Sequence, residues 1–216
     1  MFILNQENSI ANHFLADLRD VDRQKDRLRF RKNLERLGEI MAYEVSKGLS
    51  YHSNTIQSPF KEVYLEKITE KPVLISVLRA SLPFFQGFLN YLDEVDSGFI
   101  GASRMETKNQ DPIEIDLNYI AAPSIESKTL ILVDPMLATG KSFVKSVRKL
   151  LEQSGTPAKI EIVSVIAAPE GIEYIRKNLS IPHRFWICAV DEKLNAKSYI
   201  IPGLGDAGDL AFGPKL

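Results

Sequence analysis

The stretch that decides the fold runs Leu130-Ile131-Leu132-Val133-Asp134-Pro135-Met136-Leu137-Ala138-Thr139-Gly140-Lys141-Ser142. In it, an apolar run ends at an acidic side chain, a loop of small and hydroxylated residues follows, and a helical pattern begins near Ser142. Strands that are apolar throughout are typical of parallel sheets covered on both faces. Free backbone N–H groups at a helix start, together with the helix dipole, attract anions. The stretch therefore predicts a strand, a phosphate-binding loop and a helix.

Similar units extend from this stretch in both directions. Short apolar runs of the kind that form strands occupy residues 73–78, 98–102, 129–133, 160–167, 185–190 and 199–201. Helical patterns lie between several of them, at residues 82–92, 142–153 and 170–178. Strands that alternate with helices form βαβ units. We therefore expect an α/β fold with a doubly wound, mostly parallel sheet, which binds ligands beyond the carboxyl ends of its strands.

The flanking segments complete one expected domain over residues 1–216. Apolar residues recur at three- and four-residue steps before Gly48, which predicts a helix with one buried stripe. The stripe consists of Leu28, Leu34, Leu37, Ile40, Met41 and Val45. A charged, irregular stretch is expected from there to Pro72, and residues 104–123 alternate like a β-hairpin arm that leaves the sheet. The predicted parts are an N-terminal helical part (1–71), a parallel-sheet core (72–190) and a small C-terminal hood (191–216).

The composition argues against several classes of protein. The chain is 44% hydrophobic and 25% charged, which is ordinary for a globular protein. A formal net charge of −1 argues against a nucleic-acid binder that works through a large basic surface. The apolar runs are too short to cross a bilayer, the chain starts without a signal-peptide pattern, and one cysteine, Cys188, cannot form an intramolecular disulfide. We expect a cytoplasmic protein with neither nucleic-acid nor membrane partners.

Two other interpretations of the loop at residues 134–142 compete with a loop that binds a phosphate at the start of the helix. Gly140-Lys141-Ser142 matches the end of the nucleotide P-loop pattern G-x-x-x-x-G-K-[ST], but that pattern requires glycine where the chain has Pro135. A plain strand-to-helix turn with Ser142 as a helix cap is the second interpretation. The hydroxyl donors of Thr139 and Ser142, and the close backbone approach that Gly140 permits, favour the phosphate-binding loop.

The loop at residues 133–140 resembles the PRPP (5-phosphoribosyl 1-diphosphate) loop of uracil phosphoribosyltransferases, which belong to the type I phosphoribosyltransferases. Three further segments agree with that family. The early residues Leu18-Arg19-Asp20, Phe30-Arg31, Gly38 and Tyr43-Glu44 also fit it, so the resemblance spans nearly the whole chain. Leu78-Arg79-Ala80 resembles its LRAG pyrophosphate loop, and Ala167-Ala168-Pro169-Glu170-Gly171 resembles its AAPEG turn. Its C-terminal base-binding loop resembles Tyr199-Ile200-Ile201-Pro202-Gly203-Leu204-Gly205-Asp206-Ala207-Gly208-Asp209. The resemblance implies the type I fold and transfer of the 5-phosphoribosyl group from PRPP to uracil, which gives UMP and diphosphate.

The resemblance also implies a site. Its catalytic residues would be Asp206, Arg79 and Asp134. PRPP would be bound by Arg79 and Arg104, whose planar donor groups suit phosphate oxygens, and by Asp206. The PRPP loop would add Asp134, Pro135, Met136, Leu137, Ala138, Thr139, Gly140, Lys141 and Ser142. The uracil pocket would consist of Met136, Ala138, Ile200, Gly205, Asp206 and Ala207.

The resemblance further implies Mg²⁺, a metal that proteins often share with substrate phosphates through one or two carboxylates. Asp206 is the residue that would meet the metal or the ribose. The family implies a homodimer or a higher homo-oligomer, and GTP or another nucleotide is a candidate effector.

Two residues depart from the family's pattern. Lys141 stands where many members have glycine, and Ser81 replaces the usual glycine after Arg79-Ala80. A positive φ at position 81 would strain a serine. Both departures bear on fine geometry and rate more than on the class of reaction. Two other functions stay open: a regulatory member that binds UMP or PRPP with weak or no catalysis, and a phosphoribosyltransferase for another base. The terminal loop favours uracil.

Overall fold

The computed structural model describes residues 1–105 and 114–214, and it is built around one sheet with the strand order β1-β10-β9-β7-β4-β5-β6. The short strand β8 pairs with β9. Neighbouring strands are parallel except for β5 and β6, which confirms the predicted doubly wound, mostly parallel sheet. The strands are β1 (Phe2–Ile3), β4 (Val73–Leu78), β5 (Asp96–Met105), β6 (Glu114–Ala121), β7 (Thr129–Val133), β8 (Met136–Leu137), β9 (Lys159–Ala167) and β10 (His183–Val190).

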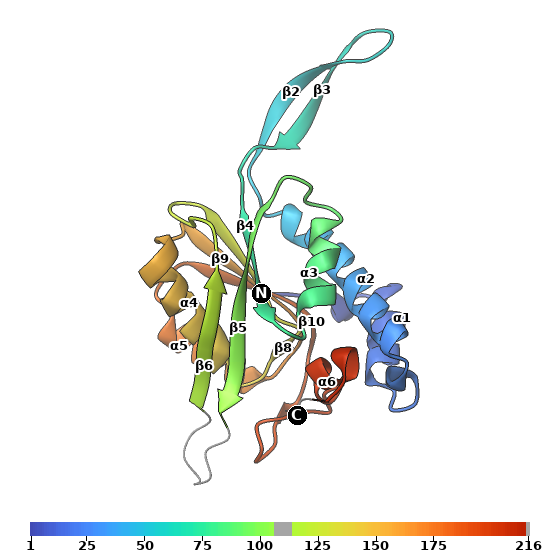
Figure 1. The fold of residues 1–216 in the computed structure, drawn as a ribbon. Helices are drawn as coiled ribbons and strands as arrows, with labels where there is room; N and C mark the ends of the chain where they lie inside the picture. The colour runs from blue at the N-terminus through green and yellow to red at the C-terminus, as the bar shows by residue number, and fades with distance from the viewer. Residues whose placement is uncertain (106–113, 215–216) are drawn as a thin grey trace.

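Helices cover both faces of this sheet (Figure 1). One face carries α4 (Lys141–Ser154) and α5 (Pro169–Asn178), and the other carries α1 (Ala11–Arg19), α2 (Arg27–Ser46) and α3 (Leu82–Leu89). Two 3-10 turns, η1 (Leu4–Gln6) and η2 (Arg23–Lys25), flank α1. Successive side chains of a strand point to opposite faces. Leu130 and Leu132 of β7 therefore pack with α4 and α5, whereas Ile131 and Val133 pack with α1, α2 and α3, and the strand must be apolar throughout.

Most predicted elements are confirmed, with small changes at their ends. Strands β4 and β7 have the predicted bounds, β9 and β10 begin slightly earlier, and β5 is longer at both ends. The helix predicted at residues 82–92 ends at Leu89. Leu28 was wrongly placed in the buried stripe of α2, because its side chain is 63% exposed. Phe30, which is 1% exposed, lies in the core instead.

The prediction of an irregular stretch up to Pro72 is wrong. Strands β2 (Tyr51–Gln57) and β3 (Glu62–Ile68) pair antiparallel, with Tyr51 opposite Ile68. This hairpin projects from the body of the molecule (Figure 1). Most of its side chains are exposed, so neither face had to be apolar and the sequence carried no periodic signal of a strand.

The hairpin arm predicted at residues 104–123 is confirmed as far as the structure describes it. Strands β5 and β6 pair antiparallel, with the backbone of Arg104 opposite Ile115. Arg104 was predicted to follow a strand, and it lies within β5 instead. Residues 106–113 lie outside the described part of the chain.

The C-terminal hood consists of β11 (Lys193–Leu194), paired antiparallel with β12 (Ile200–Ile201), and the short helix α6 (Ala207–Phe212). Figure 1 places α6 at the end of the sheet where β5 finishes, near β8. This is the carboxyl edge of the parallel strands, where open α/β sheets bind ligands. None of the described helices is long and apolar enough to cross a membrane.

Candidate active site

The predicted phosphate loop connects β7 with α4 and has the expected form. Asp134 follows β7, and its Oδ1 accepts the backbone N–H of Met136 at 3.1 Å. Gly140 takes a left-handed φ of +73°, which glycine adopts without steric cost, and α4 begins at the next residue. The first backbone N–H groups of an α-helix have no partner within the helix. The loop therefore presents a helix start, with a positive dipole end, at the carboxyl edge of the sheet.

The first turn of α5 packs tightly against this loop. A Cβ atom on Gly171, in the first turn of α5, would lie 2.1 Å from the carbonyl oxygen of Ala138. A Cβ atom on Gly140 would lie 2.5 Å from the carbonyl oxygen of Gly171. Both distances are far below any real Cβ contact, so each position requires glycine. These contacts give a role to the segment Ala168-Pro169-Glu170-Gly171, which resembles the family's AAPEG turn. The segment fixes the shape of the phosphate loop.

Arg79 lies directly after β4, as predicted, and reaches the hood. Its Nη2 atom donates to Asp209 Oδ1 at 2.9 Å and to the carbonyl oxygen of Gly213 at 3.1 Å. Its Nε is buried and has no hydrogen-bond partner among the described residues, although the side chain as a whole is 36% exposed. Buried donors are almost always satisfied in folded proteins. An arginine with an orphaned donor at a ligand-binding edge is suited to take an anionic oxygen.

Ser81 does not strain the backbone, because its φ is −73°. Its hydroxyl is fully buried, lies 2.6 Å from the hydroxyl of Ser76 and donates to the carbonyl oxygen of Val77 at 2.5 Å. The departure from the family's glycine is therefore accommodated by a local hydrogen-bond network. Lys141, the other departure, is half-buried at the first position of α4.

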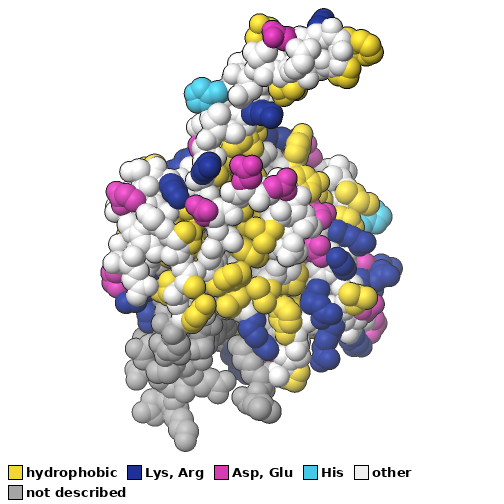
Figure 2. Space-filling view, turned by 45° about the horizontal axis from the view of Figure 1, so that its top comes forward, with side chains coloured by type: hydrophobic (Ala, Val, Ile, Leu, Met, Phe, Trp, Pro, Cys, Tyr) yellow, Lys and Arg dark blue, Asp and Glu magenta, His cyan; other side chains and the backbone are white. Residues whose placement is uncertain are grey.

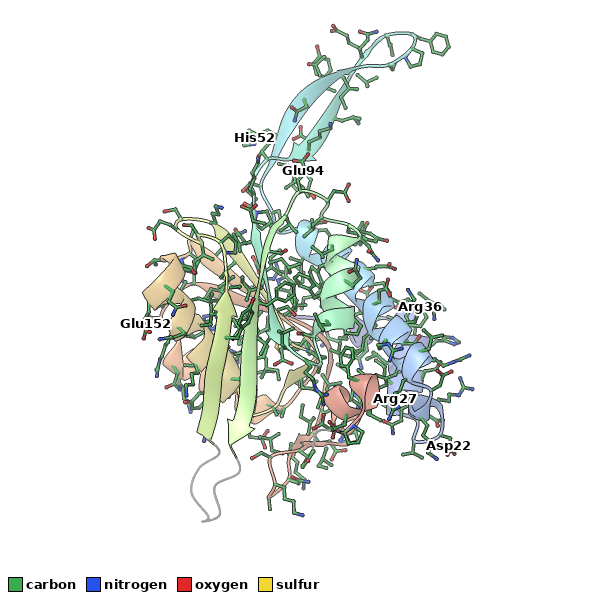
Figure 3. The ribbon with its side chains drawn as sticks, viewed as in Figure 1. Asp22, Arg27, Arg36, His52, Glu94 and Glu152 are labelled. Atoms are coloured by element: carbon green, nitrogen blue, oxygen red, sulfur yellow. The ribbon has the colours of Figure 1, made fainter. Side chains whose placement is uncertain are left out.

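Asp206 is the N-cap residue of α6. Its Oδ1 accepts the backbone N–H of Asp209 at 3.0 Å, and the residue is exposed. Gly205 before it has a φ of +90°, whereas Ile200 and Ala207 on either side of the turn are buried. Figure 3 shows Arg27, from the start of α2, beside α6, and its Nη2 would lie 3.6 Å from a Cβ atom on Gly213. The hood turn thus exposes its carboxylate while its apolar side chains face the core.

The two segments predicted to bind uracil both border the apolar core and are both attached to the end of β9. Met136 and Ala138 of the phosphate loop belong to the same apolar cluster as Ile200 and Ala207 of the hood. The end of β9 connects them, because Ala167 pairs with Leu137 and its carbonyl oxygen accepts the backbone N–H of Asp191 at 2.8 Å.

A further contact attaches the hood to α5. The carboxylate of Glu170 accepts the backbone N–H of Leu194 at 3.0 Å, and this hydrogen bond lowers the pKa of Glu170 below its ordinary value. The side chain of Arg104 is outside the described part of the structure, so the structure leaves its role untested.

Several residues at the site were missed in the sequence. Asp209, which pairs with Arg79, lies within the terminal motif but was given no role. Arg19 and Asp191 form a partly buried ion pair beside the hood, and Arg31 Nη1 donates to the carbonyl oxygen of Ala211 at 2.7 Å. No spacing in the sequence relates Arg19 to Asp191, since 172 positions separate them.

The donors at the site suit a metal that arrives with its substrate. Among the described residues, no three His, Cys, Asp or Glu side chains gather in a way that could hold a metal ion. An exposed carboxylate such as that of Asp206 is a hard oxygen ligand, and Mg²⁺ commonly binds through one or two such groups together with waters and substrate phosphates. The residues present therefore fit Mg²⁺ bound with a diphosphate and do not form a closed protein cage. Cys188 is fully buried, which raises the pKa of its thiol and leaves it unsuited to chemistry at the site.

Known proteins resemble this chain over its full length. The family model described as uracil phosphoribosyltransferase matches residues 5–214. A uracil phosphoribosyltransferase of Porphyromonas gingivalis is 46% identical over 213 residues, which cover 99% of this chain and 98% of the relative. One from Pyrococcus furiosus is 38% identical and covers 96% of this chain and 88% of its own. The solved structure of the AQ2163 protein from Aquifex aeolicus aligns over 100% of both chains with a TM-score of 0.85 and 30% identity.

Proposed function

The chain belongs to the uracil phosphoribosyltransferase family, and from this membership we propose that it transfers the 5-phosphoribosyl group of PRPP to uracil, giving UMP and diphosphate. It is thus a glycosyltransferase of uracil salvage. The observation that carries the proposal is the meeting of three segments at one edge of the sheet: the loop after β4, the loop after β7 and the hood. These segments match the family's pyrophosphate, PRPP and base-binding motifs.

We assign the parts of PRPP to the first two segments. The diphosphate would be bound by Arg79, whose orphaned Nε supports a charge-assisted hydrogen bond to a phosphate oxygen. The 5-phosphate would lie at the start of α4, against backbone N–H groups of residues 138–142 and the hydroxyls of Thr139 and Ser142. Asp134, at the beginning of the same loop, would accept hydrogen bonds from the ribose hydroxyls. Arg104 remains a predicted PRPP ligand.

Uracil would be bound between the phosphate loop and the hood. Met136, Ala138, Ile200 and Ala207 supply apolar walls, and the backbone of the turn at residues 203–206 supplies donors and acceptors for the polar edge of the base. The family's base-binding motif, which the hood matches, supports uracil as the substrate.

The reaction forms a bond from uracil N1 to ribose C1 while the bond from C1 to the diphosphate oxygen breaks, and the proton of N1 passes to the departing diphosphate or to water. Positive charge develops on the ribose ring, as in glycoside cleavage. The carboxylates of Asp134 and Asp206 would stabilise this charge, and Arg79 would neutralise the departing diphosphate. Much of the rate enhancement would come from holding the base and C1 in line. Mg²⁺ bound through Asp206 and the diphosphate would supply further charge neutralisation on the leaving group.

The remaining features of the assignment are also proposals. The chain acts as one domain with an N-terminal helical part, a sheet core and a hood. Exposed apolar side chains on the β2–β3 hairpin support a homo-oligomer: Phe60 is 97% exposed and Tyr64 is 73% exposed, and Figure 2 shows hydrophobic side chains on this projection. Large exposed apolar groups commonly mark a protein interface. Regulation by GTP or another nucleotide and a cytoplasmic location stay predictions from the sequence.

The test is conversion of radiolabelled uracil to UMP by purified protein with PRPP and Mg²⁺, beside parallel reactions with cytosine, hypoxanthine and orotate. We expect turnover with uracil alone, lost when PRPP is omitted. Turnover with another base but not with uracil would reassign the base pocket. Binding of PRPP or UMP without turnover of any base would indicate a regulatory protein and reject the proposed activity.

A further inference from the structure

We infer that Arg19 and Asp191 are positioning residues for the uracil-binding turn, an inference that rests on the proposed function. Arg19, at the end of α1, donates from Nη1 to Asp191 Oδ2 at 2.9 Å and from Nη2 to Asp191 Oδ1 at 2.5 Å. The same Nη1 donates to the carbonyl oxygen of Gly203 at 2.9 Å. Asp191 Oδ2 in turn accepts the backbone N–H of Gly203 at 2.9 Å. The pair therefore binds both backbone polar groups of one residue in the hood.

The surroundings make this arrangement rigid. The side chain of Asp191 is 4% exposed and that of Arg19 is 25% exposed. A two-point contact between a guanidinium and a carboxylate fixes the relative orientation of the two planes. Because the carboxylate is removed from water, the geometry of its partners matters more than it does in a surface ion pair.

Gly203 is the position at which the turn needs support. Its φ is +67°, and a Cβ atom there would lie 2.2 Å from the carbonyl oxygen of Ile200, so the chain reverses sharply between Ile200 and Gly203. The proposed pocket residues Ile200, Gly205 and Ala207 stand on either side of this reversal. A base that is recognised by backbone N–H and C=O groups requires those groups to be held within a fraction of an ångström. Two side-chain contacts to Gly203 supply that constraint.

Asp191 also connects the uracil-binding turn to the phosphate loop through backbone contacts. The backbone N–H of Asp191 donates to the carbonyl oxygen of Ala167, the last residue of β9. Ala167 pairs in the sheet with Leu137 of the phosphate loop. One short chain of contacts thus runs from the loop proposed to hold ribose phosphate, through Ala167 and Asp191, to Gly203. Loss of the pair would move uracil relative to C1 of the ribose while leaving the PRPP loop in place.

The experiment measures steady-state constants for both substrates with the full-length variants Arg19→Lys and Asp191→Asn. Lysine keeps the charge but cannot make the three directed contacts, and asparagine keeps one acceptor for Gly203 but loses the ion pair. We expect the KM for uracil to rise about tenfold or more, whereas the KM for PRPP stays within about twofold. The double variant should lose little more than the worse single variant, because both act on one contact network.

A matched control is Arg23→Lys. Arg23 also pairs with an aspartate, Asp17 of α1, but its side chain is 60% exposed and this contact lies away from the hood. We expect both KM values to stay unchanged in this variant.

A purely structural role for the Arg19–Asp191 pair predicts a different result. Fewer folded molecules would lower the apparent kcat and leave both KM values unchanged, and that outcome would overturn the inference. Equal increases in the two KM values would also overturn it, since the pair would then serve the whole site. If Asp191→Asn does not fold, Arg19→Lys carries the test alone. Failure of the unmodified chain to use uracil at all would reject the proposed function, a result that differs from unchanged KM values in active variants.

Discussion

The Nη2 atom of Arg79 lies 2.9 Å from Oδ1 of Asp209, although 130 positions separate the two residues in the sequence. This ion pair joins the end of β4 to the first turn of α6, and the same Nη2 also donates to the carbonyl oxygen of Gly213. Arg79 therefore contacts the hood. A diphosphate that binds to the guanidinium must share it with, or take it from, Asp209.

Substitution of Arg79 by lysine should separate the two substrates. Lysine keeps the positive charge but lacks the planar fork that can contact Asp209, Gly213 and a phosphate oxygen together. We expect the KM for PRPP to rise by about tenfold or more, with a smaller change in the KM for uracil. Inhibition by diphosphate should weaken in parallel. Arg176→Lys, at an exposed pair with Glu173 on α5, is the matched control and should leave all three constants unchanged. An equal loss for uracil and PRPP would contradict the diphosphate assignment.

Asp206→Asn should remove most of the activity from a folded protein. Asparagine is as good an N-cap as aspartate, so the hydrogen bond to the backbone N–H of Asp209 should persist and the free energy of unfolding should change by no more than about 0.5 kcal/mol. The negative charge, however, is lost. We expect kcat to fall by about a hundredfold or more.

The control for Asp206→Asn is Asp26→Asn at the N-cap of α2, whose side chain accepts the backbone N–H of Arg29 in the same way. This variant should keep its activity. Unchanged turnover in Asp206→Asn would remove Asp206 from the mechanism.

Ser81→Ala should destabilise the protein without altering its kinetic constants. The hydroxyl of Ser81 lies between the carbonyl oxygen of Val77 and the hydroxyl of Ser76, and both serines are fully buried. Its removal leaves a buried polar group short of a partner, which costs about 1–3 kcal/mol in the free energy of unfolding. Denaturant unfolding and steady-state assays check the two parts. A changed KM for PRPP in the folded variant would show that Ser81 shapes the pyrophosphate loop directly.

Ser81 also shows where prediction from the sequence stops. The strands β4 and β7 could be predicted residue by residue because burial on both faces demands an apolar side chain at every position. The substitution of glycine by serine raised the question of a positive φ, which only the backbone conformation could answer. The motifs located Arg79, the loop at residues 134–142 and Asp206 because local sequence determines a strand end and the helix start or turn that follows it.

The contacts between distant segments could not be predicted in the same way. Arg19 and Asp191 are ordinary charged residues in the sequence, and only the complete fold places the end of α1 beside the residue that follows β10. The β2–β3 hairpin was not predicted because it has few buried residues. Most of its side chains are exposed, so no pattern of buried residues marks it.

That hairpin provides a test of assembly. Phe60, at its tip, is 97% exposed, and replacement by serine should favour smaller species if the hairpin contacts a second copy of the chain. Sedimentation velocity over a range of protein concentrations measures the distribution of species. Val21→Ser is the control, because Val21 is 68% exposed but lies beside η2, in the main body of the molecule. An unchanged distribution for Phe60→Ser would exclude the tip of the hairpin from the contact.

Gly171→Ala should displace the backbone of the phosphate loop. The added Cβ atom would lie 2.1 Å from the carbonyl oxygen of Ala138 and 2.5 Å from the side chain of Leu137, and the first of these atoms is backbone that cannot move aside alone. Relief requires a shift of the loop that is proposed to bind the 5-phosphate. Overpacking of this kind costs about 1–3 kcal/mol of stability, and displacement of the helix start should raise the KM for PRPP by about tenfold or more.

Gly48→Ala is the control for steric effects of a new methyl group, since a Cβ atom there meets its nearest neighbours at 3.4 Å, an ordinary van der Waals contact. It should fold and turn over normally. If Gly171→Ala lost stability but kept the KM for PRPP, the loop would have relaxed without moving its backbone N–H groups. The proposed contact of those groups with the 5-phosphate would then depend on the conformation at Gly140 and not on support from α5.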